Sequence, residues 1–262
     1  MPDNGPVRAR KALPFARTAA VVAAVTAVTA VAGCGSDATQ QAATPPSAPA
    51  AGTAAGAAVE PRADLARRVA AAKDRRFVAA YAWTGSGAPR TVTVTLAADG
   101  TWRVDIPGGA EGGRSGVSLV GRAEGVYQCS TSGCVRVARA AGTVPAGVDP
   151  KVHHPFTDWP AVLADPHAAL SVTAAATLPG VSGTCFSVEP TTVSIAPPID
   201  PGIFCYGDDG MPTGVRTRFG TLALAGPPAP APATAELAGP VSHGQPLSTS
   251  APPAQPSPSR SR

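Results

Sequence analysis

Two alternating stretches joined by an Asp-Gly turn constrain the fold of this chain most strongly. Residues 91–97 (TVTVTLA) and 101–107 (TWRVDIP) place an apolar side chain at every second position. This period is typical of a strand with one buried face, and Asp99-Gly100 is a strong signal for a tight hairpin. The sequence therefore predicts an antiparallel pair. Its inward positions, which we expect to line a cavity, are Val92, Val94, Leu96, Trp102, Val104 and Ile106.

The surrounding sequence predicts more strands and two helices. Residues 62–76 carry apolar side chains at helical spacing. A short helix is expected within 153–165, with Thr157 or Asp158 as its N-cap and Pro160 in its first turn. Further strands are expected in 116–130, 170–178, 183–190, 202–210 and 212–226, where glycine and proline separate apolar runs. The predicted class is α+β with an antiparallel sheet.

The first 33 residues have the organisation of a secretory signal. Arg8, Arg10, Lys11 and Arg17 precede an uncharged run, 18–33, which is too short to span the ~30 Å hydrocarbon core as a helix. Val31-Ala32-Gly33-Cys34 matches the bacterial lipobox, in which the cysteine becomes lipidated and N-terminal. We therefore expect a signal peptide over 1–33. The mature protein is expected on the extracytoplasmic face of the cell membrane, held by a diacylglycerol-bearing, palmitate-type lipid anchor on Cys34.

Composition divides the mature chain into three parts. Residues 34–61 are rich in alanine and proline and contain no aromatic side chain, so they are expected to form a disordered linker after the lipidated cysteine. Residues 62–225 hold nearly all the aromatic side chains and suit one domain. Residues 226–262 resemble the linker in composition and are expected to form a disordered tail.

Charge and cysteine content exclude some classes of function. The chain carries a net charge of +4, of which the signal accounts for +3, so the mature protein lacks the basic footprint of a nucleic-acid-binding protein. Removing Cys34 leaves four cysteines, which an oxidising compartment converts to two disulfides with three possible connectivities. Pairing of neighbours, Cys129 with Cys134 and Cys185 with Cys205, is favoured. A four-cysteine zinc site is the alternative, but it favours two-residue gaps within each pair.

No motif in the sequence indicates catalysis. A nucleophile elbow and a phosphate-binding lysine loop are both missing. His153 and His154 are adjacent, and in extended backbone they would point in opposite directions, so no shared metal is expected. Asp158 has no assignable carboxylate partner for glycoside hydrolysis. We therefore expect a protein that is not an enzyme and holds no metal or cofactor.

Two stretches resemble the LolA-like group of envelope lipoproteins, which includes the LppX- and LprG-like proteins of actinobacteria. They are FVAAYAWTGSG with TVTVTLAADGTWRVDIPGG, and FCYGDDGMPTGVRTRFGTLAL. The resemblance covers 77–222 and implies an antiparallel sheet curved as a half-barrel, with one or more helices on its concave face. It also implies an apolar cavity that carries acyl chains.

The resulting hypothesis is a surface lipoprotein that binds a lipid or another amphiphile. The alternative is an envelope interaction or sensor module with a filled core that recruits a protein partner. An acyl chain in the cavity would favour the first, and a solid interior would favour the second.

Overall fold

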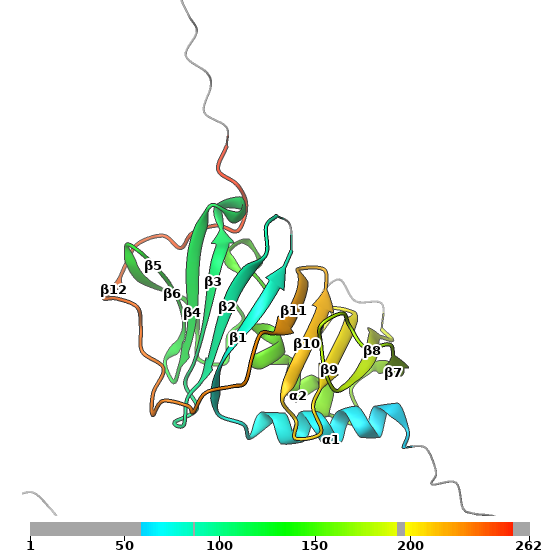
Figure 1. The fold of residues 1–262 in the computed structure, drawn as a ribbon. Helices are drawn as coiled ribbons and strands as arrows, with labels where there is room; N and C mark the ends of the chain where they lie inside the picture. The colour runs from blue at the N-terminus through cyan, green and yellow to red at the C-terminus, as the bar shows by residue number, and fades with distance from the viewer. Residues whose placement is uncertain (1–58, 86, 193–196, 254–262) are drawn as a thin grey trace, which may run out of the picture. The chain divides into compact units, whose positions relative to one another are not determined.

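The computed structural model describes residues 59–85, 87–192 and 197–253, which belong to one structural unit that begins at Ala55. The predicted signal peptide, Cys34 and most of the predicted linker lie outside the described residues. The described part confirms the α+β class. It contains an open, mostly antiparallel sheet of twelve strands and two α-helices (Figure 1).

The helices are α1 (Pro61–Lys73) and α2 (Trp159–Ala164), with 3₁₀ turns η1 (Glu111–Gly113), η2 (Ala146–Val148) and η3 (His154–Phe156). The strands are β1 (Phe77–Thr84), β2 (Arg90–Leu96), β3 (Trp102–Ala110), β4 (Ser115–Arg122), β5 (Gly125–Ser130), β6 (Gly133–Arg139), β7 (Leu170–Ala175), β8 (Thr184–Pro190), β9 (Gly202–Tyr206), β10 (Pro212–Thr217), β11 (Gly220–Leu224) and β12 (Val241–Ser242).

The strand order is β12-β6-β5-β4-β3-β2-β1-β11-β10-β9-β8-β7. Neighbouring strands from β1 to β6 and from β7 to β11 are consecutive in the sequence, so the sheet consists of two runs of hairpins joined where β1 pairs with β11. The predicted hairpin is present, with Val94 opposite Val104 across β2 and β3. The β6–β12 pair is the parallel one.

Both helices begin with proline in the first turn, as helix geometry permits. In α1 the side chain of Glu60 accepts hydrogen bonds from two backbone N–H groups and caps the helix. The predicted side-chain cap of α2 is not formed. Asp158 occupies the N-cap position, but its carboxylate binds His154 instead.

One face of the sheet carries the main apolar core. Over β8–β10, side chains of α1 and α2, such as Leu65 and Leu163, pack on Phe186 and Phe204. Over β1–β3, two residues of the segment before α2 pack on the predicted inward positions; they are Val152 and Phe156. The helices and the segment before α2 therefore cover the same face of the sheet. Through α1, the N-terminal end of the domain packs on this face.

Both disulfides join the predicted neighbours. The Cys129–Cys134 bond crosses β5 and β6, and the Cys185–Cys205 bond crosses β8 and β9. All four sulfur-bearing side chains are buried. The pairs stand directly opposite each other in the strand register, so the bonds hold adjacent strands in place.

The composition-based boundary at residue 225 requires correction. Residues 226–262 were expected to form a disordered tail, and 254–262 lie outside the described residues. Residues 226–253, the C-terminal strap, lie along the β1–β6 half of the sheet (Figure 1). Ala229 exchanges two backbone hydrogen bonds with Val78 of β1, and β12 in the strap pairs with β6. The domain therefore extends at least to residue 253.

The strap covers the face opposite the helices. Arg103 donates to the carbonyl of Glu236, whereas its neighbour Val104 points into the core beneath Val152 and Phe156. Leu237 packs on a small apolar cluster around Val120 and Tyr127. The strap thus closes a second, smaller core on the outer face.

Candidate functional site

The segment 149–158, between η2 and α2, places four polar side chains together. Asp149 Oδ1 accepts from the backbone N–H of Lys151, whose φ of 65° turns the chain sharply. The backbone of His153 then has helical angles, φ −81° and ψ −28°. Because this backbone is helical rather than extended, the rings of His153 and His154 lie on the same side, with centroids 4.1 Å apart. The prediction that they point in opposite directions was wrong.

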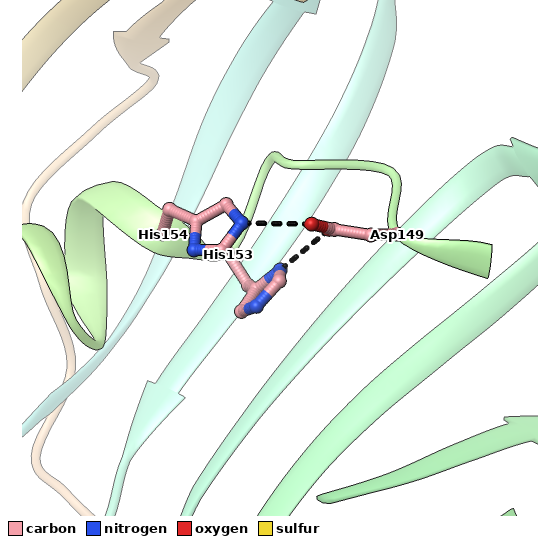
Figure 2. Close-up of side chains that lie close together, drawn as sticks. All are labelled: Asp149, His153 and His154. Atoms are coloured by element: carbon pink, nitrogen blue, oxygen red, sulfur yellow. Dashed lines mark hydrogen bonds and ion pairs between the residues drawn. The ribbon is translucent and has the colours of Figure 1, made fainter. Parts of the chain in front are cut away.

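His154 lies between two carboxylates, those of Asp149 and Asp158, and Figure 2 shows the one of Asp149. Its Nε2–H donates to Oδ2 of Asp149 at 2.9 Å, and its Nδ1–H donates to Oδ1 of Asp158 at 2.7 Å. Ionised carboxylates only accept hydrogen bonds, so both ring nitrogens carry protons in this arrangement. Burial disfavours the charged ring, but the hydrogen bonds to both carboxylates outweigh it and raise the pKa of His154 to about 9.

His153 occupies a different environment. Its side chain is 4% exposed, its ring stacks on Trp102 with centroids 5.5 Å apart, and its Nδ1 has no hydrogen-bond partner. Nδ1 lies 3.6 Å from Oδ1 of Asp149 (Figure 2). Burial and the adjacent His154 cation lower the pKa of His153 to about 4, so the ring is neutral at physiological pH.

Trp102 borders a pocket on each side. A Cβ at position 121 would lie 2.1 Å from its ring, so Gly121 on β4 allows the indole to lie flat over the sheet. A pocket of about 190 Å³ lies where α1, the β2–β3 turn and the start of α2 meet. A second pocket of about 370 Å³ is lined by Trp102, both histidines, Asp158 and residues 121, 122, 125, 126 and 139–144.

The smaller pocket, called here the Trp102 pocket, has apolar walls and a cationic edge. Its apolar lining includes Leu96, Trp102 and Phe156, and the exposed Lys73 and Arg76 at the end of α1 also border it. Such a combination suits a ligand with one apolar and one anionic part.

The predicted cavity-lining residues separate into two groups. Leu96 and Trp102 line the Trp102 pocket, whereas Val92, Val94 and Val104 are completely enclosed by packed side chains. Ile106 is also buried in this core and borders an open pocket near β4 and β5. The alternation identified the inward face but not the residues that cover it.

Sequence reasoning missed Asp149 and the pairing of Asp158 with His154. The sequence feature that could have revealed this group is its spacing. Steps of four, one and four residues separate Asp149, His153, His154 and Asp158. Residues four apart share a side in helical turns, so this spacing would group the four side chains if the segment were helical.

No family model matches the chain, and no curated protein is similar to it in sequence. The resemblance to the LolA-like group therefore stays a prediction. Among the helices of the described ranges, none has the length and apolar character needed to cross a bilayer.

Proposed function

We propose that this chain is an envelope lipoprotein, tethered by Cys34, whose domain binds an anionic amphiphile in the Trp102 pocket. In this proposal the open sheet is a curved half-barrel, and α1, α2 and segment 149–158 occupy its concave face. The packing of these three segments on the same sheet face supports this arrangement. The two disulfides are consistent with folding in an oxidising, extracytoplasmic compartment.

The observation that carries the ligand proposal is the composition of the Trp102 pocket. Leu96, Trp102 and Phe156 offer apolar contacts, while Lys73 and Arg76 can attract an anionic headgroup. The volume of about 190 Å³ is below the ~300–1,000 Å³ of pockets that enclose drug-sized ligands. The proposed ligand is therefore a single-chain amphiphile, or one chain end of a larger lipid.

The ligand proposal predicts selective effects of two variants on amphiphile binding. Leu96→Glu places a carboxylate among the apolar walls and should weaken binding of both dodecyl phosphate and the neutral dodecyl maltoside by at least about tenfold. The double variant Lys73→Ala/Arg76→Ala removes two exposed cationic side chains. It should weaken binding of dodecyl phosphate by about threefold and leave binding of dodecyl maltoside unchanged. Calorimetry below the micelle concentration measures both effects.

Leu170→Glu on β7 is the matched control, because Leu170 is also half-buried but lies outside the pocket. Binding of neither probe, or binding that Leu96→Glu leaves unchanged, would reject the ligand proposal. That result would favour the interaction or sensor module, which the enclosed side chains of Val92, Val94 and Val104 already support.

The anchoring proposal predicts a change of cellular fraction. Cys34→Ala removes the thiol that accepts the lipid, so the variant should lose the mass of the lipid anchor and the lipid-dependent association with membranes. Detergent partitioning and mass spectrometry of the purified chain measure these changes. The mutation Ser36→Ala, two residues away, is the control. Anchoring and mass shift like those of the unaltered protein in Cys34→Ala would contradict the proposal.

A further inference from the structure

Asp149, His153 and His154 present a carboxylate and two imidazoles at one point in the fold. Their potential ligand atoms all lie within 4.8 Å of one another. Four ligands held about 2.0 Å from a zinc ion in a tetrahedron are about 3.3 Å apart. His154 Nε2 lies 2.9 Å from Oδ2 of Asp149, and His153 Nδ1 lies 3.6 Å from Oδ1 of the same carboxylate, so the two separations lie on either side of this value. We propose that these three residues bind Zn²⁺.

Independent support comes from the unpartnered nitrogen of His153. Nδ1 is buried, has no hydrogen-bond partner and faces Asp149 (Figure 2). A buried polar atom without a partner is destabilising, and most such atoms in native proteins have one. Coordination of a metal ion would use the lone pair of this nitrogen.

Asp158 completes the arrangement as a positioning residue. It accepts from Nδ1–H of His154, which fixes the ring so that Nε2 faces Asp149. Metal-bound histidines commonly donate their other ring N–H to a carboxylate in this way. When Zn²⁺ binds, it replaces the proton on Nε2, and that proton is released to solvent.

The chemistry of the donor set favours zinc over calcium. Imidazole and carboxylate suit Zn²⁺, whereas Ca²⁺ takes six to eight oxygen ligands. The ligands contain no thiol, so an oxidising compartment would leave them intact. The site borders the pocket of about 370 Å³ beside Trp102, and water can supply the remaining ligand, as in zinc sites with three protein ligands.

Calorimetric titration of the full-length protein in detergent, purified without a histidine tag and stripped with chelator, tests the proposal. Zn²⁺ should bind with 1:1 stoichiometry and micromolar or tighter Kd and raise Tm, and Ca²⁺ should not bind. Co²⁺ at the same site should give the visible absorption of a low-symmetry, four- or five-coordinate ion.

Variants separate metal binding from a purely structural role. His153→Phe keeps an aromatic ring against Trp102 and removes no hydrogen bond of Nδ1, so the fold should be retained while Zn²⁺ affinity falls at least about 100-fold. Asp149→Asn should have a similar effect on affinity, and Asp158→Asn should weaken binding by about 10- to 100-fold. The exposed His243→Gln is the matched control and should leave affinity unchanged.

Two results would overturn the proposal. One is the lack of stoichiometric Zn²⁺ binding by the chelator-treated protein. The other is Zn²⁺ binding that His153→Phe leaves intact in a folded variant. Either would leave Asp149, His154 and Asp158 as an ion-pair network. The zinc proposal does not depend on the amphiphile proposal, because Leu96→Glu and His153→Phe act on different ligands.

Discussion

Truncation of the chain after Ala225 is expected to lower the free energy of unfolding by about 5 kcal/mol or more, which is comparable to the stability of a whole domain. The truncated chain loses the strap carbonyls that accept from the backbone N–H groups of Ala98, Asp99 and Cys134. It also exposes the cluster that Leu237 covers. Thermal and urea denaturation, followed by circular dichroism, measure the loss.

A chain ending at Pro253 is the control for this truncation and should unfold at the same midpoint as the full chain.

A single substitution that removes one contact of the strap tests its contribution to stability separately. The amide of the buried Gln128 donates to the carbonyl of Leu247 at 3.0 Å and accepts from its N–H at 2.6 Å. Gln128→Leu should reduce stability by about 2 kcal/mol, whereas the exposed Gln245→Leu should have little effect. Equal midpoints for the full chain and the chain ending at Ala225 would show that the strap does not stabilise the domain.

Replacement of Cys185 and Cys205 by alanine is expected to reduce stability by about 3 kcal/mol. The bond joins residues 20 apart in sequence, and loop closure in the unfolded chain accounts for most of this value in the chain-entropy model. The denaturation midpoint under non-reducing conditions measures the loss, and added reductant should lower the midpoint of the unaltered protein toward that of the variant.

The matched control is the double variant Cys129→Ala/Cys134→Ala. This bond joins residues only five apart, so its removal should reduce stability by about 2 kcal/mol. Both bonds link directly opposed residues of adjacent strands, which makes the comparison one of loop length. A larger loss for the shorter loop would contradict the loop-closure account.

The parts of the fold predicted correctly depend on neighbouring residues. Asp99-Gly100 specifies the β2–β3 turn through its own backbone preferences, and the cysteine pairs lie on strands that follow one another in the chain. Such local signals are contained in a short window of sequence, so pattern alone predicts them.

The strap was missed because its composition is typical of disorder. Its prolines lack an N–H, so the segment can lie on a sheet with few donors left to satisfy, while its carbonyls accept from Arg103 and Arg122. These partners are more than 100 residues distant in sequence. An argument from composition therefore detects that the strap lacks aromatic side chains. It does not detect that the backbone carbonyls of the strap accept hydrogen bonds from distant residues of the sheet.

The candidate sites were missed or misplaced for a similar reason. The hairpin alternation predicted the inward face of β2 and β3, but Val152 and Phe156, which pack on it, come from segment 149–158. In that segment, the positive φ of Lys151 and the helical backbone at His153 determine the grouping of the side chains. The spacing of apolar residues in the sequence predicts neither of these backbone conformations.

The pairing of β1 with β11 has a consequence for the order of folding. Tyr81 lies opposite Leu224, so this contact closes a loop of about 140 residues, whereas the strands on either side form from successive hairpins. Contacts of such long range form slowly, because the entropy of loop closure opposes them. A chain that crosses a membrane from its N-terminus, as proposed for this one, would keep its two halves separate until β11 emerged. In such a chain the topology would delay completion of the fold until translocation was nearly finished.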